Sequence, residues 1–376
     1  MREAAIAWTV AVLLFLGLGN FTGEASGAAA AETGSRLRIR DLFTDVRMPN
    51  IIVVPDGSVL AFADGCRLLR RSEDGGETWS EAREVCPGGG NAIVDRSTGD
   101  VLIVCPRKER LYRSEDNGRT WARQKITMKP NAVGHGTPDG VPVGVVASES
   151  GITLQHGEHK GRLLMPARIQ PPEGSNAQEF WPYNYNCAIY SDDGGRTWHT
   201  SAPVQSGTGE GTLAELSSGS IYYNSRCHMA VDNRRRIAWS HNGGEMWVDW
   251  RVSDELFEVG EPFYFKYGTE PQYGCNAGLT RMPLEATGGE DVLLFSTPDN
   301  PGGSRVRMTV WASFDGAESW PVKRLIYEGP SAYSSLAADE EGTIYLLFER
   351  GEDELYESIA LARFDLQWLT RGEGMP

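Results

Sequence analysis

The octet SDDGGRTW (residues 191–198) occurs three times in this chain with small changes. The other copies are SEDGGETW (72–79) and SEDNGRTW (114–121), and degraded copies follow at 240–247 (SHNGGEMW) and 313–320 (SFDGAESW). Ser and Asp side chains can bond the backbone N–H groups of a tight turn, glycine supplies a positive φ, and tryptophan packs the turn onto a sheet. Because strand-like sequence precedes each copy, we predict that each octet is a hairpin turn, which stabilises a fold and does no chemistry.

A second series of turns lies between the octets, with apolar runs on both sides of each turn. These turns are centred on residues 55–57, 97–99, 159–161, 217–219, 287–289 and 340–342. Two hairpins make a four-stranded unit, so the pattern predicts an all-β fold, a six-bladed β-propeller of four-stranded antiparallel blades. The rival fold, a pair of long β-sandwiches, explains the repeated turn less well.

The N-terminus has the pattern of a secretory signal. An apolar run, AAIAWTVAVLLFLGLG (4–19), follows Arg2 and precedes small residues, which predicts a signal peptide in residues 1–30 with cleavage between 25 and 30. The alternative is an uncleaved membrane anchor, for which the run is short. We expect a secreted or periplasmic protein with one domain over residues 37–376. Export permits disulfides, but the spacing of the six cysteines does not define their pairing.

Charge and motif content exclude several classes of function. The formal net charge is −15, which argues against a nucleic-acid or anionic-membrane partner. An anionic substrate would therefore need a local cluster of positive charge. The chain has no HExxH motif and no close His/Cys cluster, so we expect no metal and no cofactor. The oligomeric state is not indicated.

Several segments between the octets resemble exo-α-sialidases (neuraminidases), whose Asp box, or BNR repeat, has the pattern Ser-x-Asp-x-Gly-x-x-Trp. The resemblance covers about residues 47–349. Its segments are VRMPNIIVVPDGSVLAFADG (46–65), SGITLQHGEHKGRLLMPAR (150–168), GEGTLAELSSGSIYYNSR (209–226), SRVRMTVWASFDG (304–316) and GPSAYSSLAADEEGTIYLLFE (329–349).

The resemblance implies an enzyme that removes terminal α-linked sialic acid from sialylated glycans or glycoproteins, with retention of configuration. It also implies a role for each of six residues. Arg47, Arg226 and Arg305 match the arginines that bind the substrate carboxylate, Tyr333 matches the nucleophile, Glu210 matches its partner, and Glu349 matches the acid that holds the first arginine.

Hairpin geometry supports the same grouping from the residues alone. Antiparallel partners lie symmetrically about their turn, and inner hairpins of a propeller all point the same way. Three polar pairs satisfy this symmetry and are expected at one rim: Glu210 with Arg226 about residue 218, Tyr333 with Glu349 about 341, and Arg47 with Asp64 near 56.

The residue types also suit an anionic sugar. Arginine forks bind a carboxylate and stay charged. A neutral tyrosine nucleophile avoids the repulsion that a carboxylate would meet, provided that a base such as Glu210 takes its proton.

The chain departs from the family where the general acid is expected. The family inserts a loop with a proton-donating Asp after the strand that ends here in AFADGC (61–66), and Cys66 stands where the family has Arg. Asp64 is one substitute, although it could instead form a salt bridge with Arg47, and Asp139 in GHGTPDG (134–140) is another. A third alternative is that no acid exists and only substrates with good leaving groups react.

Other readings stay open. The aromatic loop at 169–186 could stack on a sugar face or pack over a strand edge. The chain could be a lectin-like propeller that binds sialic acid without turnover, a glycosidase for a related nonulosonic acid, or a propeller used for protein contacts.

Overall fold

The structure is a computed structural model that describes residues 36–131, 144–170, 184–229, 232–260 and 274–371. The chain divides into two units, residues 1–34 and 35–376, and every described element belongs to the second. Its described helices are short: η1 (Pro106–Lys108), η3 (Leu284–Thr287) and α1 (Leu366–Leu369). None of them has the length and apolar character of a membrane span. The chain is therefore nearly all-β, as predicted.

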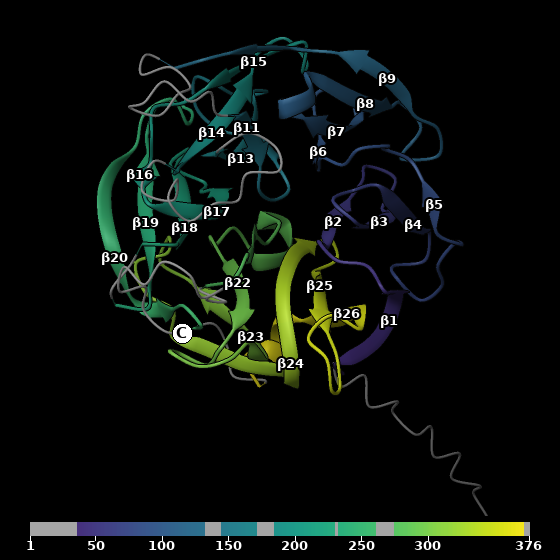
Figure 1. Ribbon diagram of the computed structural model, residues 1–376, viewed down its shortest axis with the longest axis vertical. Coiled ribbons are helices and arrows are strands. Elements are labelled where there is room, and N and C mark those ends of the chain that lie inside the picture. Colours follow the sequence, from purple (N-terminus) through teal and green to yellow (C-terminus); the bar gives the residue numbers. More distant parts are fainter. Residues whose placement is uncertain (1–35, 132–143, 171–183, 230–231, 261–273, 372–376) are drawn as a thin grey trace, which may run out of the picture. The chain divides into compact units, whose positions relative to one another are not determined.

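The described strands form five sheets, which follow one another in chain order (Figure 1). The first two are β2 (Asn50–Val53), β3 (Val59–Ala63), β4 (Leu68–Ser72) and β5 (Arg83–Glu84), then β6 (Asn91–Val94), β7 (Val101–Cys105), β8 (Arg110–Ser114) and β9 (Ala122–Lys125). The third has seven strands in the order β10 (Thr127–Lys129), β15 (Thr197–Thr200), β14 (Tyr185–Ser191), β13 (Leu163–Gln170) and β11 (Gly144–Ala147), with β12 (Ile152–Thr153) on β13 and β16 (Gln205–Ser206) on β14.

The fourth sheet has four strands and the fifth has seven. The fourth is β17 (Thr208–Glu215), β18 (Ile221–Cys227), β19 (Arg234–Ser240) and β20 (Val248–Phe257). The fifth runs in the order β21 (Gly278–Arg281), β22 (Leu293–Pro298), β23 (Val306–Ser313), β24 (Val322–Ala338), β25 (Thr343–Arg350), β26 (Ser358–Asp365) and β1 (Arg38–Thr44).

Two strands make the fifth sheet larger than the predicted four-stranded unit. β24 has 17 residues; its first half pairs with β23 from residue 322 to 330, and its second half pairs with β25 from 331 to 338. β1, at the start of the described chain, pairs antiparallel with β26, and Arg38 lies opposite Arg363. The structure therefore groups the strands into five sheets of four or seven strands, not into six separate sheets of four.

All six predicted inner hairpins are present. The strand pairs that flank the turns are β2–β3, β6–β7, β12–β13, β17–β18, β21–β22 and β24–β25. The predicted register of the first hairpin is wrong by one residue, because Asn50 lies opposite Phe62. The backbone N–H of Asp64 nevertheless donates to the carbonyl of Arg47 at 2.6 Å, so these two residues are neighbours as expected.

The octets are turns that follow the hairpins, as predicted. In the copy at 191–198, the N–H of Gly195 donates to the hydroxyl of Ser191 at 2.9 Å, and the N–H of Thr197 donates to Asp193 at 2.9 Å. The indole N–H of Trp198 donates to the carbonyl of Gly195 at 3.0 Å, and the Trp198 side chain is completely buried. Each octet joins two neighbouring strands of one sheet, such as β14 and β15 here.

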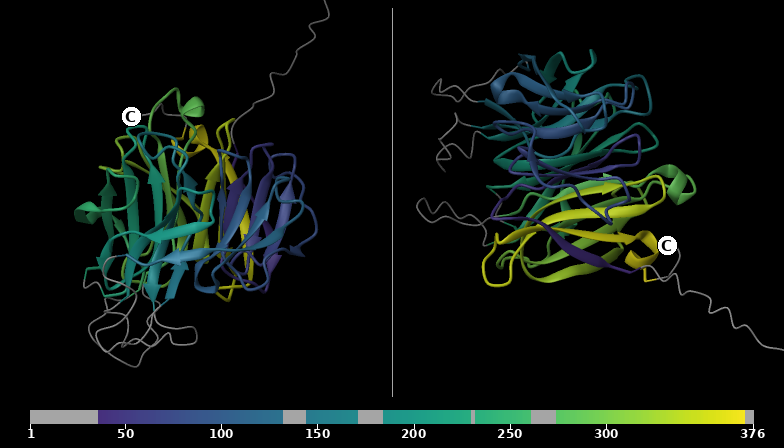
Figure 2. Two further views of the ribbon diagram at one scale, coloured as in Figure 1. Left: turned by 90° about the horizontal axis from the view of Figure 1, so that it is seen from above. Right: turned by 90° about the vertical axis from the view of Figure 1, so that its right-hand side faces the viewer.

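The core lies between the sheets, which Figure 2 shows side by side. Every residue of β3 and of β7 is buried, so both faces of these strands are covered. One apolar cluster joins Leu60 and Phe62 of β3 to Val101 and Ile103 of β7. Burying a side chain of this kind contributes about 1.5–3 kcal/mol, which explains why the inner strands read as apolar runs.

Candidate active site

Tyr333, Glu210 and Arg226 form one hydrogen-bonded cluster. The hydroxyl of Tyr333 donates to Oε1 of Glu210 at 2.8 Å and accepts a hydrogen bond from Nη1 of Arg226 at 3.0 Å. The same nitrogen donates to Oε2 of Glu210 at 2.7 Å. Glu210 and Arg226 are only 8% and 7% exposed, so the contacts are largely shielded from water. The geometry gives the phenol proton a carboxylate acceptor.

Glu210 and Tyr333 both lie where their strands depart from regular pairing. The register between β17 and β18 shifts within residues 208–211, and that between β24 and β25 shifts within residues 331–334. A bulge of this kind re-aims a side chain that regular alternation would point elsewhere. Two hairpins from different sheets therefore deliver their polar residues to one point.

Glu349 of β25 is fully buried and holds both Arg47 and the backbone of Tyr333. Its Oε1 accepts hydrogen bonds from Nε of Arg47 at 3.1 Å and from the N–H of Met48 at 2.9 Å. Its Oε2 accepts from Nη2 of Arg47 at 3.2 Å and from the N–H of Tyr333 at 3.1 Å. This fork-to-carboxylate pair fixes one edge of the guanidinium and leaves the other edge available for an anion.

Arg305 is held by one carbonyl and one phenol. Its Nη2 donates to the carbonyl of Gly274 at 2.9 Å, and its Nη1 donates to the hydroxyl of Tyr356 at 2.8 Å. The ring of Tyr356 also covers Arg47, whose Cζ lies 3.6 Å from the ring centroid. The Cζ atoms of Arg47 and Arg305 lie 5.2 and 5.5 Å from the centroid of the Tyr333 ring. The structure thus brings all three predicted arginines to Tyr333.

Three residues at the site were missed by the sequence analysis: Arg168, His228 and Tyr356. Nη1 of Arg168, on β13, lies 3.3 Å from Oε1 of Glu210, and Nε2 of His228 lies 3.9 Å from Oε2 of Glu210. Arg168 stands at the open end of its hairpin, opposite the turn, and this position could have identified it. The placement of His228 and Tyr356 had no comparable sequence signal.

The charges of the site set the protonation of the Tyr333–Glu210 pair. Burial alone would raise the pKa of Glu210, but Arg168 and Arg226 hold it well below its ordinary value. Burial and the neighbouring Glu210 raise the pKa of Tyr333 to about 12, although Arg226 and Arg305 oppose that rise. At neutral pH the carboxylate is therefore ionised and the phenol keeps its proton.

The site is positive within an acidic chain. It carries four arginines against two carboxylates, an excess of two positive charges, whereas the whole chain has a net charge of −15. The site residues in this count are Arg47, Arg168, Arg226, Arg305, Glu210 and Glu349. A carboxylate ligand would reduce this excess, so the site favours an anion.

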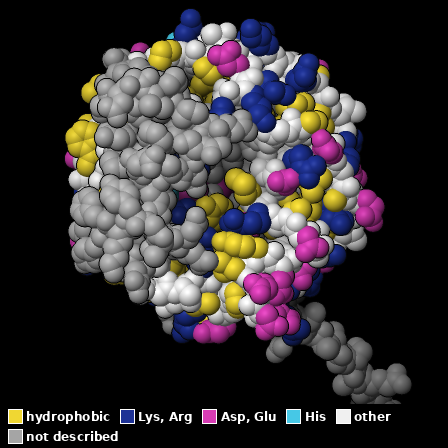
Figure 3. All heavy atoms as spheres, viewed as in Figure 1, with side chains coloured by type: hydrophobic (Ala, Val, Ile, Leu, Met, Phe, Trp, Pro, Cys, Tyr) yellow, Lys and Arg dark blue, Asp and Glu magenta, His cyan; other side chains and the backbone are white. Residues whose placement is uncertain are grey.

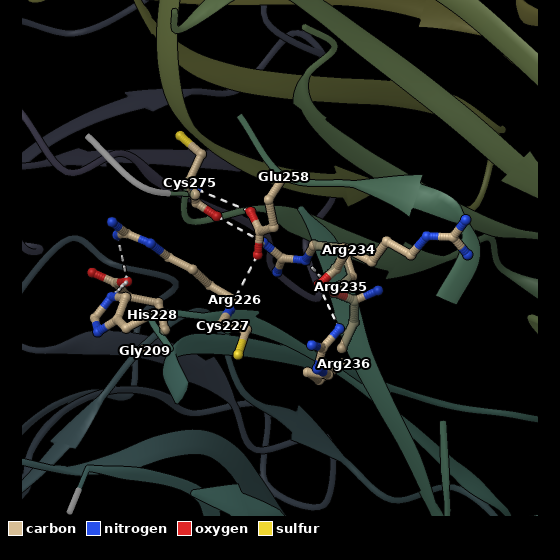
Figure 4. A network of polar contacts seen from close by, with 12 residues as sticks. Gly209, Arg226, Cys227, His228, Arg234, Arg235, Arg236, Glu258 and Cys275 are labelled. Carbon is tan, nitrogen blue, oxygen red and sulfur yellow. Dashed lines mark hydrogen bonds and ion pairs between the residues drawn. The ribbon is translucent and has the colours of Figure 1, made fainter. Parts of the chain in front are cut away.

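A buried ion pair supports Arg226 from behind (Figure 4). Oε1 of Glu258 accepts from Nη1 of Arg235 at 3.0 Å and from the N–H of Cys227 at 3.1 Å, and its Oε2 accepts from the N–H of Cys275 at 3.3 Å. The side chains of Glu258 and Arg235 are both fully buried. Because Cys227 directly follows Arg226, this pair fixes the strand end from which Arg226 projects.

A second buried carboxyl, Glu149, ties several segments together close to the site. It accepts hydrogen bonds from Asn50 at 2.8 Å, from the hydroxyl of Ser335 at 2.5 Å and from Asn276 at 3.4 Å. Each partner lies two or three positions after a residue of the site along its own segment. Burial raises the pKa of Glu149 to about 7, although its hydrogen bonds oppose the rise.

The predicted acids have different outcomes. The carboxylate of Asp64 pairs with Nε of Arg67 at 2.5 Å, so the alternative of a salt bridge between Asp64 and Arg47 is wrong, because Glu349 takes that guanidinium. Asp139 lies outside the described residues, as do residues 171–183 of the aromatic loop. Among the described residues, Glu210 is the only carboxylate that accepts a hydrogen bond from the hydroxyl of Tyr333, since Glu349 accepts from the backbone N–H of that residue.

The face shown in Figure 3 places Lys and Arg side chains beside hydrophobic ones near its middle, next to atoms that are not described. Acidic side chains are spread over the rest of the described surface in that view. Positive, acidic and hydrophobic side chains are therefore mixed on the described part of this face.

The fold and the site together define a class: an all-β protein in which arginines from several hairpins surround a tyrosine–carboxylate pair. Residues 104–346 match the family model described as a BNR repeat-like domain. The chain is 31% identical to a sialidase of Micromonospora viridifaciens over 88% of its own length and 53% of the relative. It is also 26% identical to a sialidase of Bacteroides fragilis, over 75% of the chain and 53% of that relative.

This chain belongs to the sialidase family with BNR repeats. It spans about half the length of these two relatives. Among solved structures it is similar to a Hadza microbial sialidase, with a TM-score of 0.64, 23% identity and coverage of 86% of this chain and 66% of that one. It is also similar to a leech intramolecular trans-sialidase, with a TM-score of 0.67, 14% identity and coverage of 89% and 71%. These two likenesses concern the fold.

Proposed function

We propose that this protein is an exo-α-sialidase that removes terminal α-linked sialic acid from glycans or glycoproteins. One observation carries the proposal. The hydroxyl of Tyr333 donates a hydrogen bond to the ionised carboxylate of Glu210, and three arginines lie around the Tyr333 ring. The substrate carboxylate would bind the arginine forks, which places the adjacent anomeric carbon next to the phenol oxygen.

The proposed reaction runs in two steps with retention of configuration. The oxygen of Tyr333 attacks the anomeric carbon, Glu210 takes the phenol proton, the bond to the leaving sugar breaks, and the leaving oxygen takes up a proton from a general acid. Water then attacks the same carbon and gives a proton to the conjugate base of that acid, the tyrosyl bond breaks, and Tyr333 recovers its proton from Glu210. The pKa of Tyr333 is raised to about 12, so the phenol is protonated at neutral pH. The carboxylate of Glu210 is therefore required as a base in the first step.

The family membership and the strand pairing support a six-bladed arrangement. Dividing β24 between its two partners gives one four-stranded unit with β21, β22 and β23, and another with β25, β26 and β1. The first, second and fourth sheets are single units, and the third holds one more. Six blades would direct their inner hairpins toward one central site.

The general acid is the open part of the proposal. Asp64 lies beside Arg47, and its carboxylate is paired with Nε of Arg67 at 2.5 Å. We expect Asp64→Asn to slow the hydrolysis of sialyl-lactose at least tenfold, and to leave a phenolic sialoside, whose leaving group needs no proton, nearly unchanged. Equal slowing of both substrates would show that Asp64 is not the general acid.

The test of the function is turnover of sialyl-lactose by the purified chain, with Tyr333→Phe beside it. We expect the variant to lose at least a thousandfold in kcat while sialic acid still binds, because the nucleophile is lost and the arginines remain. Tyr327→Phe is the matched control, since Tyr327 lies on the same strand and its hydroxyl donates to the carbonyl of Gly351, away from the site.

A mass increase on Tyr333 after reaction with a fluorinated sialic acid would identify the covalent intermediate, and proton NMR of the first product would report retention. Unchanged turnover in Tyr333→Phe would refute the mechanism.

A lectin-like protein is the second candidate function. The missing acid loop favours it, since binding needs the arginines and no proton donor. Binding of sialic acid with no turnover by the parent chain would select this function.

We also propose export, on the basis of the apolar run at 4–19. N-terminal sequencing of the protein recovered outside the cytoplasm would locate the cleavage between residues 25 and 30 that we expect.

A further inference from the structure

Cys86 and Cys105 bring their sulfur atoms into contact. Their Sγ atoms are 3.6 Å apart, and the two residues are 0% and 5% exposed. Cys86 lies between β5 and β6, and Cys105 ends β7. We propose that these two thiols form a disulfide, Cys86–Cys105, when the chain reaches an oxidising compartment. The proposal rests on the export proposed above and is independent of the sialidase activity.

The local geometry is suited to the bond. A disulfide has an S–S length of about 2.0 Å, so the sulfurs need to approach by roughly 1.5 Å, which small rotations of two side chains can supply. Both sulfurs face the same carbonyl, that of Gly89, and the sulfur of Cys86 lies 3.3 Å from it. Closing the bond removes two weak S–H donors and leaves the backbone hydrogen bonds of β7 in place.

The two thiols have different chemical roles. The S–H of Cys86 lowers the pKa of Cys105, against the effect of burial, and Arg110 and Lys108 lower it further. The same contact and burial raise the pKa of Cys86. Cys105 is therefore the thiolate that attacks first.

The oxidation is a pair of thiol–disulfide exchanges with a small disulfide such as oxidised glutathione. The Cys105 thiolate attacks one sulfur of the oxidant and releases one thiol. Cys86 then attacks the Cys105 sulfur of this mixed disulfide and releases the second thiol. The protein loses two S–H bonds and gains one S–S bond, and the oxidant disulfide is reduced to two thiols.

The cross-link would fix a segment beside the site. The N–H of Val85 donates to the carbonyl of Arg67 at 2.9 Å, and the N–H of Gly90 donates to the carbonyl of Gly65 at 2.7 Å. Residues 85–90 therefore line the turn that carries Asp64. The bond closes a loop of 19 positions, which restricts the unfolded chain.

Cys66 is the competing thiol. It belongs to the same apolar cluster as Cys86 and Cys105, and its sulfur donates to Oδ1 of Asn50 at 3.3 Å. A link through Cys66 would break this hydrogen bond, which also engages an asparagine whose amide binds Glu149. The favoured pairing therefore leaves Cys66 reduced.

The experiment compares the full chain produced in an oxidising periplasm with the same chain produced in a reducing cytoplasm. Each preparation is denatured, alkylated without reduction, digested and mapped by mass spectrometry. We expect a linked peptide pair containing Cys86 and Cys105 in the periplasmic protein, with the other four cysteines alkylated. The cytoplasmic protein should carry six alkylated cysteines and acquire the same link on incubation with oxidised glutathione.

Thermal unfolding gives a second readout. We expect the cross-linked protein to unfold about 5 °C higher than the reduced protein. Cys105→Ser should abolish the difference between the two preparations, whereas Cys187→Ser, which removes a buried thiol on β14, should preserve it. Six free thiols in the periplasmic protein, or a link through Cys66, would overturn the proposal.

Discussion

The pKa of Glu210 depends on the arginines that contact its carboxylate. A buried carboxyl would ordinarily resist ionisation, but Arg168 and Arg226 contact its two oxygens at 3.3 and 2.7 Å. Arg226 also touches Tyr333, so it belongs to the reacting group, whereas Arg168 contacts the carboxylate from another sheet. Arg168 therefore only lowers the pKa of Glu210, whereas Arg226 lowers this pKa and also donates a hydrogen bond to the phenol of Tyr333.

This division predicts the effect of Arg168→Met on the pH profile. Activity requires ionised Glu210, whose pKa lies below its ordinary value, so the acid limb of kcat/KM should lie below about pH 4.5 in the parent. Loss of the Arg168 charge should move this limb to higher pH. Arg196→Met, in an exposed turn, is the control and should leave the limb in place. An unshifted limb in Arg168→Met would show that Arg226 alone sets the acidity.

Tyr356 predicts a second effect at this scale. Its hydroxyl accepts from Arg305 and its ring covers Arg47, so Tyr356→Phe removes the hydrogen bond and keeps the stacking. Loss of a bond to a charged donor costs about 1.5 kcal/mol, and we expect KM for sialyl-lactose to rise about tenfold with kcat little changed. Steady-state kinetics would show this split, and a fall in kcat at constant KM would contradict it.

The six matched site residues could be predicted from the sequence because they lie in segments that resemble the family. For the hairpins, the turn also fixed which strand ends lie together. Glu349 and Arg47, for example, were placed by a hairpin and a motif, and the structure joins them through two hydrogen bonds. His228 and Tyr356 could not be placed, because their contacts arise from packing between segments far apart in the chain. The alternative that paired Asp64 with Arg47 was wrong, because Glu349 binds Arg47 and Arg67, three residues along the chain, pairs with Asp64.

The strands are joined by two kinds of turn with different roles, the inner hairpin turns and the octet turns. The inner hairpin turns are short and end in glycine, and they leave the opposite strand ends to carry chemistry. The octet turns instead satisfy their own backbone, as in the copy at 114–121, where Asp116 accepts from the N–H and the hydroxyl of Thr120 at 2.7 and 2.6 Å. The spacing of the octets could be read from the sequence. The length of β24 could not, because Gly329-Pro330 at its midpoint would ordinarily indicate a break between two strands.

Asp116→Ala therefore tests an octet as a structural unit. The substitution removes the acceptor for Thr120 and for the hydroxyl of Ser114, and we expect a loss of about 1–2 kcal/mol of unfolding free energy with unchanged kcat. Urea denaturation followed by tryptophan fluorescence would measure it. Glu115→Ala is the matched control at the neighbouring exposed position and should stay within about 0.5 kcal/mol of the parent. A loss of activity without a loss of stability would give the octet a catalytic role that we do not expect.

At the scale of the whole molecule, Glu149 joins segments from four parts of the chain. Its partners Asn50, Asn276 and Ser335 come from regions that are separated by more than 50 residues in sequence. Burial raises the pKa of Glu149 to about 7, against the effect of its hydrogen bonds. Sequence reasoning could not find it, because SES (148–150) resembles an ordinary surface loop.

The raised pKa of Glu149 predicts a pH-dependent stability. The folded state keeps this proton up to about pH 7, whereas the unfolded chain releases it near pH 4.5, so stability is lost as pH rises through this window. Glu149→Gln cannot titrate and should gain about 3 kcal/mol relative to the parent between pH 4.5 and pH 8. Urea unfolding at the two pH values measures the change, with Glu115→Gln as the exposed control. A constant difference between variant and parent would show that Glu149 is ionised in the folded protein.

The pairing of β1 with β26 has a consequence for how the protein is made. Arg38 lies opposite Arg363, so β1 must wait until β26 has left the ribosome before it finds its partner. At about 5–20 residues per second, that delay is on the order of tens of seconds. During this time β1 is an unpaired edge, and its exposed Arg38 and Arg40 place charge on it, a pattern that discourages pairing with a neighbouring nascent chain. β26 thus completes the sheet to which β1 belongs.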